Sequence, residues 1–286
     1  MKYTIKDFNK AFKTEDDCLE HIFKSRIGEN SPCPKCGFRK WYRITGRKVW
    51  SCGKCRYQVH PLAGSIFHKS DTPLMSWFFA IYKFANSRNG VAAKELQRDL
   101  GVTYKCAWRI GKQVRKLMEM DDYKLGGNVE VDEAEMKVRP KVKGQKTDIV
   151  AMVERGGSAK VKAMEYISSS NIIPMIKSEV KQGSNVMTDA SRLYSQSKLP
   201  NFKHSFVNHS KGEYSLGNVH INTTESLFGQ IKRSISGTYH QVSEQHLQSY
   251  LDEFAWRFSH GRLGIPLFVL LLNQLCQAQR PAIDKI

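Results

Sequence analysis

This 286-residue sequence has no long hydrophobic run, few acidic residues and no regular set of cysteine pairs. Its seven cysteines are an odd number, and four of them form two close pairs, which indicates metal binding in a reducing compartment rather than a disulfide framework. The longest apolar run, at 267–272, is too short to span a bilayer. The N-terminal residues lack the apolar core of a signal peptide, so we expect none, and no membrane partner.

The charge balance is strongly basic. Lysine and arginine number 45 against 27 acidic residues, giving a formal net charge of +18. Such an excess suits a polyanionic partner, most simply DNA or RNA. A basic surface for solubility or for membrane binding is the alternative. The basic residues are spread along the whole chain rather than gathered in one amphipathic helix, which favours nucleic acid.

Two close cysteine pairs predict a metal site. Cys33 and Cys36 form one pair, Cys52 and Cys55 the other, and fifteen residues separate the pairs. This spacing is typical of a four-cysteine Zn²⁺ site, in which four thiolates leave no open position for chemistry. The intervening segments 41–44 and 47–50 flank a Thr-Gly turn and predict a hairpin. Residues 31–70 are therefore interpreted as a zinc ribbon, with four ordinary buried cysteines as the alternative.

The predicted ribbon carries basic residues interleaved with tryptophan and tyrosine. Arg43, Arg47 and Lys48 are the candidate contacts to a DNA backbone, supported by neighbouring aromatic rings. A purely structural ribbon is the milder interpretation.

Helical patterns lie on both sides of the ribbon. Residues 1–30 contain a capped helix beginning at Thr14, and 71–122 contain a helix after Thr72-Pro73 and two more on either side of Gly101. A short helix, a glycine turn and a basic helix resemble a helix-turn-helix. Three-helix packing without DNA contact is the alternative. The candidate DNA contacts on the last helix are Lys105, Arg109, Lys112, Arg115 and Lys116.

From residue 128 the pattern changes to strands. The predicted order is three strands (129–135, 147–154 and 160–167), a helix (171–181), two strands (185–188 and 202–208) and two helices (223–235 and 243–258). This order is that of an RNase H-like fold. We therefore expect an α+β multi-domain protein in which a zinc ribbon and a helix-turn-helix precede an RNase H-like mixed-sheet domain at 128–262. A last apolar helix within 263–286 is expected to pack as core.

Three carboxylates are expected to meet in that domain. The first and fourth strands of the fold lie side by side, so Asp132 and Asp189 would face each other, and a helix beginning near residue 222 would add Glu225. Three converging carboxylates suit Mg²⁺ or Mn²⁺. Lys232, two turns after Glu225, would hold a DNA strand. Each acid also has a simpler explanation: Asp132 could lie on a solvated edge strand, Asp189 could cap a helix beginning at Ser191, and Glu225 could be a first-turn charge favoured by the helix dipole.

Longer motifs make a family resemblance specific. They are VEVDE around Asp132, MVERGG at 152–157, TD ending at Asp189, VNHSKGEY at 207–214, HINTTESLFGQIKRSISGTYHQVS at 220–243 and HLQSYLDEFAWRF at 246–258, with CPKCG, SCGKC and GSIF in the ribbon. In these segments the chain resembles the DDE-type transposases of prokaryotic insertion sequences that carry an N-terminal zinc ribbon. The resemblance covers most of the chain.

The resemblance implies a cytoplasmic, DNA-associated enzyme that binds terminal inverted repeats, nicks the element ends and joins the 3′-hydroxyls to target DNA by a Mg²⁺-dependent two-metal mechanism. It implies Asp132 and Asp189 as catalytic metal ligands. The third ligand is Glu225 or Asn222, of which we favour Glu225 and keep Asn222 as a direct or supporting partner. Lys232 and Arg233 would contact DNA. Joining two ends requires at least a homodimer in the DNA complex.

Two other functions are compatible with parts of the sequence. One is a catalytically inactive DNA-binding regulator derived from a transposase, against which the intact acidic set argues. The other is a zinc-ribbon transcription or RNA-processing factor, against which the acidic residues and the motifs at 207–258 argue.

Overall fold

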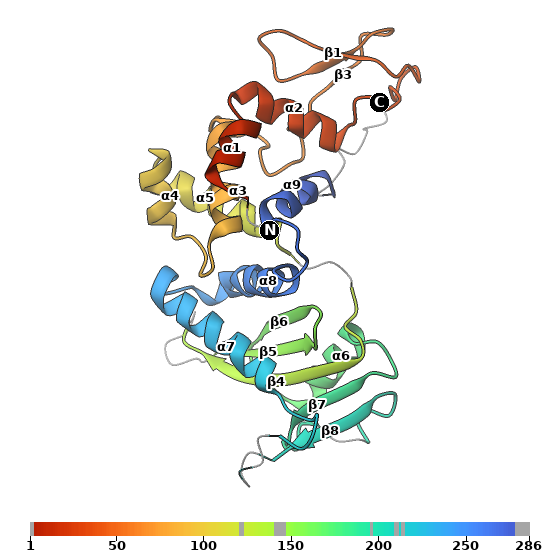
Figure 1. The fold of residues 1–286 in the computed structure, drawn as a ribbon, viewed down its shortest axis with the longest axis vertical. Coiled ribbons are helices and arrows are strands. Elements are labelled where there is room, and N and C mark those ends of the chain that lie inside the picture. Colours follow the sequence, from red (N-terminus) through yellow and green to blue (C-terminus); the bar gives the residue numbers. More distant parts are fainter. Residues whose placement is uncertain are drawn as a thin grey trace. The chain divides into compact units, whose positions relative to one another are not determined.

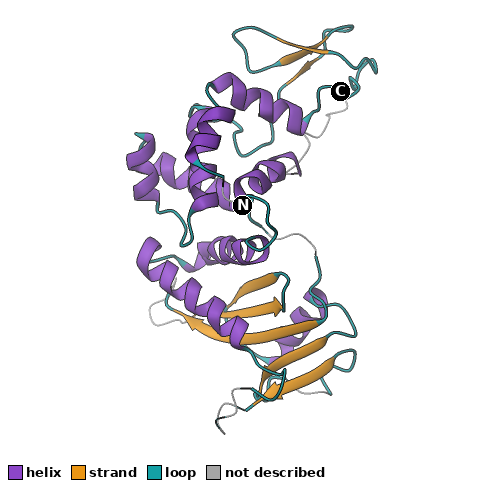
Figure 2. Ribbon diagram, viewed as in Figure 1, coloured by secondary structure: helices purple, strands orange, loops and turns teal. Residues whose placement is uncertain are grey.

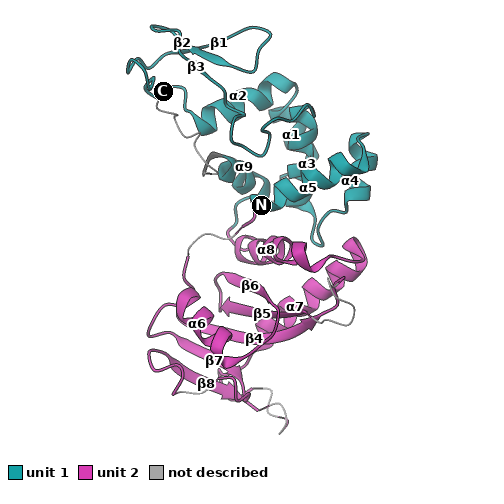
Figure 3. Ribbon diagram, turned by 180° about the vertical axis from the view of Figure 1, so that it is seen from behind, with its two compact units in different colours: residues 1–117, 264–286 teal, residues 118–263 magenta. Residues whose placement is uncertain are grey.

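The computed structural model describes residues 3–119, 123–139, 147–194, 197–208, 212 and 215–277. The chain divides into two compact units, coloured separately in Figure 3. Unit 1 consists of residues 1–117 and 264–286, and unit 2 of residues 118–263. The C-terminal segment thus belongs with the N-terminal elements, and each unit is described by itself.

Unit 1 is mainly helical, with a small sheet (Figure 2). A capping box between Thr14 and Asp17 begins the second helix, as the sequence predicts. A short first helix was not predicted, and its own capping box joins Thr4 to Asp7. The helices are α1 (Ile5–Ala11), α2 (Glu15–Arg26), α3 (Leu74–Asn86), α4 (Ala93–Leu100), α5 (Tyr104–Lys116) and α9 (Leu267–Gln277).

An aromatic core ties the two ends of the chain together in unit 1. Helix α9 packs against α2 and α3. Phe268 of α9 is buried, and its ring centroid lies 5.9 Å from that of Phe8 and 6.1 Å from that of Phe12. The apolar C-terminal helix is therefore core, as predicted, and its partners are the N-terminal helices.

The ribbon strands are shorter and differently placed than the sequence predicts. They are β1 (Trp41–Arg43), β2 (Trp50–Cys52) and β3 (Gln58–Val59), in the order β1-β2-β3. The predicted hairpin placed the second strand at 47–50, but β2 begins at Trp50, which pairs with Arg43. This register sets Trp41 opposite Cys52, so the strand ends within the second cysteine pair. The connection is correspondingly longer and turns at Gly46, whose φ of 74° suits glycine.

Helices α4 and α5 form the two predicted elements around Gly101. Gly101 ends α4 in the left-handed conformation, with φ 64° and ψ 25°. The hydroxyl of Thr103 accepts a hydrogen bond from the backbone N–H of Cys106 and so caps α5. The two helices pack against each other.

Unit 2 is built on a five-stranded mixed sheet in the order β6-β5-β4-β7-β8. Its first three strands are antiparallel neighbours, whereas β7 lies parallel to both β4 and β8. The predicted adjacency of the first and fourth strands of this region is thereby confirmed. The strands are β4 (Asn128–Met136), β5 (Thr147–Glu154), β6 (Ala159–Met164), β7 (Asn185–Asp189) and β8 (Lys203–Val207).

Helices cover both faces of this sheet (Figure 1). On one face, Val129 and Val131 of β4 pack with α6 (Ser169–Glu179). On the other, β5 and β6 pack with α7 (Asn222–Ser234) and α8 (Glu244–His260), and a short π-helix (Ile235–Tyr239) follows α7. Of the helices that the structure describes, none combines the length and apolar character needed to cross a membrane.

Candidate functional site

The predicted pair Asp132 and Asp189 lies on the two central parallel strands. The ladder between β4 and β7 ends with Glu130 opposite Met187, and continuing this register by two residues sets Asp132 opposite Asp189. Side chains alternate along a strand, so both point to the face that α7 covers. The Asp189 carboxylate also accepts a 3.0 Å hydrogen bond from the backbone N–H of Ser191. The alternative in which Asp189 caps a helix beginning at Ser191 is wrong, because residues 191–194 form no helix, and this hydrogen bond closes a turn instead.

Glu225 approaches the pair from the first turn of α7. This helix packs against β4 and β5. Asn222 is the first residue of the same helix, and both Asn222 and Glu225 are exposed. Lys232 and Arg233 are exposed in its last turns.

The acids influence one another electrostatically. Burial, together with the negative charges of Glu133, Asp189 and Glu225, raises the pKa of Asp132 to about 7, although a hydrogen bond from the backbone of Glu133 opposes the rise. In this environment the charged form of the Asp132 carboxyl group is less stable than it would be in water. A bound cation would stabilise the charged form, because it replaces like-charge repulsion with attraction.

A fourth acid, missed by the sequence analysis, is the next residue of β4, and the alternation of side chains turns it toward the α6 face of the sheet. Glu133 is half-buried next to Asp132, and the hydroxyl of buried Tyr194 donates a hydrogen bond to its carboxylate. Burial raises the pKa of Glu133, with Asp189 and Asp148 adding to the rise while the Tyr194 bond lowers it. The segment after β7 is thereby tied to β4. The repeated acids of VEVDE were the available signal, but their partner Tyr194 is distant in sequence.

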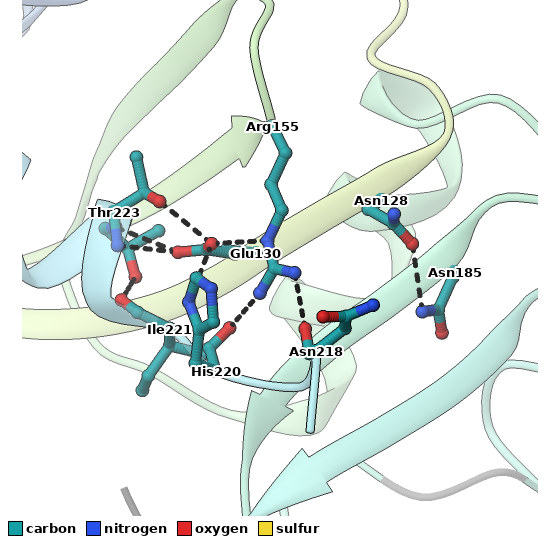
Figure 4. A network of polar contacts seen from close by, with 9 residues as sticks. Asn128, Glu130, Arg155, Asn185, Asn218, His220, Ile221 and Thr223 are labelled. Atoms are coloured by element: carbon teal, nitrogen blue, oxygen red, sulfur yellow. Dashed lines mark hydrogen bonds and ion pairs between the residues drawn. The ribbon is translucent and has the colours of Figure 1, made fainter. Parts of the chain in front are cut away.

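A buried polar network adjoins the acids on the same face of β4 (Figure 4). Glu130 is 0% exposed, and its carboxylate accepts hydrogen bonds from the Thr223 N–H (2.8 Å), the Thr223 hydroxyl (2.9 Å), the Thr224 N–H (3.3 Å) and Arg155 Nε (2.8 Å). His220 Nδ1 lies 3.3 Å from Oε1 without the alignment of a hydrogen bond. No local motif predicts this network, because Arg155 and Thr223 lie 25 and 93 residues from Glu130 in the chain.

The four predicted cysteines of unit 1 lie together. All four Sγ atoms lie within 4.8 Å of one another, with 3.6 Å between Cys33 and Cys55 and between Cys36 and Cys52. Four sulfurs at about 2.3 Å from a tetrahedral Zn²⁺ lie roughly 3.8 Å apart. The cysteine set therefore fits a structural zinc ion.

The carboxylates of unit 2 are spread more widely. Within the described parts of the chain, the cysteines are the only group of three or more potential ligands whose donor atoms all lie within 4.8 Å. The donor chemistry of Asp132, Asp189 and Glu225 still fits Mg²⁺ or Mn²⁺, which prefer carboxylate oxygens and retain water ligands. The pKa of Asp132, raised first by burial and then by the neighbouring negative charges, is compatible with this fit, because a bound cation would favour the charged carboxylate.

The candidate DNA contacts on α5 differ in their accessibility. Lys105 and Lys116 are exposed. Arg109 donates a 3.2 Å hydrogen bond to the carbonyl of His68, and the Lys112 ammonium lies over the Trp108 ring. Arg115 contradicts the expectation of a DNA contact: it is 4% exposed, and its guanidinium lies over the Phe84 ring. It packs inside the helical unit because its position in the last turn faces α3.

The ribbon residues also differ. The guanidinium of Arg43 lies 2.5 Å from the Asp16 carboxylate and over the Trp50 ring. Arg47 and Lys48 are exposed. Lys48 lines an open cavity of about 670 Å³ whose other basic lining residues are His60, His68 and Lys69. Two features of unit 1 thus present basic groups to solvent: the ribbon with its adjoining cavity, and α5.

Comparison with protein families decides the relationship. A model of the ISXO2-like transposase domain matches residues 114–259, and a model of the transposase zinc-ribbon domain matches residues 13–58. The first match spans just over half of the chain and includes β4, β7 and α7. The chain belongs to the ISXO2-like transposase family. The resemblance inferred from its motifs is thereby confirmed, as is the presence of a zinc-ribbon domain.

Individual relatives agree with this family. An uncharacterized protein in the transposable element ISH50 of Halobacterium salinarum is 25% identical over 275 residues, covering 87% of this transposase and 92% of the relative. An uncharacterized transposase-like protein of Haemophilus influenzae is 27% identical over 104 residues, 36% of this chain and 83% of the relative.

A solved structure shows only a faint likeness. It is a chain of the simian T-cell lymphotropic virus intasome in complex with PP2A regulatory subunit B56 gamma, with 13% identity and a TM-score of 0.33. The match covers 59% of this transposase and 65% of that chain, slightly under two thirds of its length. A likeness this weak has no bearing on the fold or the site.

Proposed function

We propose that this transposase is a DDE-type enzyme whose unit 2 is an RNase H-like catalytic domain that cuts DNA at the ends of an insertion sequence and joins them to a target. The observation that carries the proposal is the placement of Asp132 and Asp189 in register on β4 and β7, with Glu225 close enough on α7 to raise the pKa of Asp132. An adjacent parallel pair of acids on one sheet face, with a third on the covering helix, is a suitable frame for hard cations.

In this proposal Asp132, Asp189 and Glu225 hold two divalent cations. Bound Mg²⁺ or Mn²⁺ supplies activation of the attacking oxygen and stabilisation of the leaving oxygen in phosphodiester transfer. Glu225 is preferred to Asn222 as the third ligand because its charge influences Asp132.

Basic residues on both units would hold the DNA. Lys232 and Arg233 are exposed on the helix that carries Glu225, where they can contact phosphates near the reacting strand. In unit 1, we assign recognition of the terminal inverted repeats to α4 and α5 as a helix-turn-helix and to the basic side of the ribbon. Lys105 and Lys116 of α5 are the exposed candidates there.

The proposed partners follow from the reaction. The substrate is double-stranded DNA, both at the element ends and at the target. Since two ends must be joined, the working complex contains at least two copies of the chain. A DNA-associated enzyme of the prokaryotic cytoplasm fits these requirements.

The test is a strand-transfer assay with a labelled duplex bearing the terminal repeats of the element. Wild type is compared with Asp189→Asn in Mg²⁺ and in Mn²⁺, and DNA binding is measured in parallel. Asp252→Asn is the matched control, because it removes a half-buried carboxylate on α8 that is not among the three acids.

Joined product from wild type and the control, with a loss of at least about a hundredfold in Asp189→Asn at unchanged DNA binding, is expected. Full activity of Asp189→Asn would overturn the assignment. Repeat-specific binding with no cutting or joining by any protein, over varied metals and end sequences, would support the inactive DNA-binding regulator instead.

A further inference from the structure

The N-terminus of α7 has no cap of its own. Its N-cap residue, Ile221, provides no side-chain hydrogen bond, so the first backbone N–H groups of the helix need acceptors from elsewhere. Glu130 supplies them from β4, 93 residues earlier in the chain, by accepting from the N–H groups of Thr223 and Thr224. A carboxylate at this position also complements the positive end of the helix dipole.

Arg155 holds the segment that leads into the helix. We call Glu130 and Arg155, with the groups that they bind, the Glu130 clamp. The Nε of Arg155 donates to Glu130, while its two terminal nitrogens donate to the carbonyls of Asn218 and His220, the latter at 2.9 Å. Arg155 immediately follows β5. One ion pair thus anchors both the entry to α7 and its first turn to the central strands of the sheet (Figure 4).

The clamp adjoins the proposed catalytic acids both on β4, where it includes Glu130, and on α7, where it includes Thr224. Glu130 is two residues from Asp132 on the same side of β4, and Glu225 directly follows the capped Thr224. The acceptor that holds the helix and the acid that the helix must meet are therefore fixed to one short piece of strand. A small displacement of the first turn would move Glu225 relative to Asp132 and Asp189.

We propose that Glu130, with Arg155, is the positioning residue that sets Glu225 against Asp132 and Asp189. The inference rests on the proposed function, since it assigns the clamp a role toward the divalent-cation site. Glu130 itself holds no metal here, because hydrogen-bond donors surround its carboxylate. A buried ion pair that only stabilises the fold is the alternative.

The decisive variant is Glu130→Gln, which keeps the shape of the side chain but removes its charge and one acceptor oxygen. Mn²⁺ binding is measured by calorimetry on the full chain, and the relevant site is defined as the heat that Asp189→Asn removes. Hydrogen exchange of peptides covering 221–228 is followed in parallel. Glu179→Gln is the control, since Glu179 forms an ion pair with Lys160 in the same unit, at the end of α6 on the opposite side of the sheet.

Glu130→Gln is expected to weaken Mn²⁺ binding by about tenfold, as loss of a supporting partner does in metal sites, and to speed exchange in the first turn of α7. Zinc content and binding of the end duplex stay at wild-type values, and Glu179→Gln leaves Mn²⁺ affinity unchanged. A folded Glu130→Gln protein with wild-type Mn²⁺ affinity, or an equal loss in Glu179→Gln, would overturn the proposal.

Two further variants keep the test decisive if Glu130→Gln does not fold. Thr223→Val removes the 2.9 Å hydroxyl bond to Glu130, and Arg155→Gln removes the ion pair. Each is expected to weaken Mn²⁺ binding about threefold, a fraction of the full effect. Wild-type affinity in both variants would overturn the inference. Absence of any Asp189-dependent Mn²⁺ site in wild type would instead contradict the proposed function.

Discussion

The two candidate metal sites of this transposase are built in opposite ways. In unit 1, Cys33, Cys36, Cys52 and Cys55 are close in sequence, and all their sulfurs lie within 4.8 Å of one another. In unit 2, the acids come from β4, β7 and α7, far apart in the chain, and are more widely spread. Four thiolates complete the coordination of a zinc ion, whereas three carboxylates in the proposed site would leave coordination positions for water and substrate.

The difference lies in what each set of ligands contributes without its metal. Cysteines are small and can be buried as neutral thiols, so their convergence has little electrostatic cost until metal binds. Burial and the charges of the neighbouring acids both disfavour the charged form of Asp132 and raise its pKa, so the rest of the fold must hold the acids together. The Glu130 clamp and the Tyr194 contact with Glu133 are that support. The zinc ion would therefore stabilise the ribbon around it, whereas the acids depend on the surrounding fold to bring them together.

The largest expected effect comes from breaking the zinc site. Cys36→Ser should release the zinc ion and unfold the ribbon, because binding free energy on the order of 10 kcal/mol is folding free energy in small zinc domains. Zinc content by elemental analysis and thermal unfolding of the full chain would measure this. Stoichiometric zinc with an unchanged melting temperature in Cys36→Ser would break the comparison. Retained protection of β4 and β5 in hydrogen exchange is expected, since these strands lie in the other unit.

Removal of an acid should have the opposite sign. Asp132→Asn is expected to raise the free energy of unfolding by roughly 2 kcal/mol at pH 8 without divalent cations, since burial and neighbouring charges hold the pKa of Asp132 at about 7 and water still screens a half-buried group. Chemical denaturation with and without Mg²⁺ measures the effect. Stabilisation by Mg²⁺ should disappear in the variant. A lower free energy of unfolding in metal-free Asp132→Asn would show that the charged Asp132 carboxylate does not destabilise the fold.

The sequence was sufficient for features that depend on local spacing or on strand order. Cysteine spacing predicted the zinc site, and the order of strands and helices predicted that the strands of Asp132 and Asp189 would be neighbours. Glycine and threonine at Gly101 and Thr103 placed the boundary between α4 and α5. In each case a short motif or a general rule of topology determines the outcome.

Features that depend on long-range packing could not be predicted. Ile221 gives no sign that α7 is capped, because its cap is Glu130 on β4. Burial of Arg115 depends on the approach of Phe84 from α3. The union of α9 with the N-terminal helices likewise depends on aromatic contacts made by Phe268. The candidate acids were therefore predictable, but the residues that hold them were not.

Asp252 is another half-buried acid, and it allows the effect of burial on stability to be measured through its pH dependence. Burial raises the pKa of Asp252 to about 6 from an ordinary value of 3.8, although a hydrogen bond from Gln248 and the charge of Lys162 oppose the rise. The folded state therefore binds the proton more tightly, and the stability that Asp252 contributes is complete below pH 4 and is lost as pH rises toward 6. Asp252→Asn should remove this dependence and gain roughly 1 to 2 kcal/mol at pH 7 after screening.

Denaturation midpoints between pH 4 and pH 8 would test this, with Mg²⁺ present and absent. The gain in Asp252→Asn should be the same in both conditions, because Asp252 is not one of the proposed ligands. A pH profile identical to that of wild type would contradict the role of Asp252. A Mg²⁺-dependent difference would show that the acid-specific effect extends beyond the three residues of the site.

The smallest expected effect is on DNA affinity, and it tests whether the exposed face of the zinc ribbon contacts DNA. Lys48 is exposed on the ribbon beside the cavity lined by His60, His68 and Lys69. If its ammonium neutralises one phosphate, Lys48→Gln should make the negative slope of log affinity against log salt shallower by about 0.9. Lys24→Gln is the matched control, because the Lys24 ammonium lies 2.9 Å from both Glu20 and Glu29 and is already neutralised. Fluorescence anisotropy with the end duplex at several salt concentrations gives both slopes. Equal slopes for Lys48→Gln, Lys24→Gln and wild type would remove this face of the ribbon from the DNA interface and leave the cysteine site with a purely structural role.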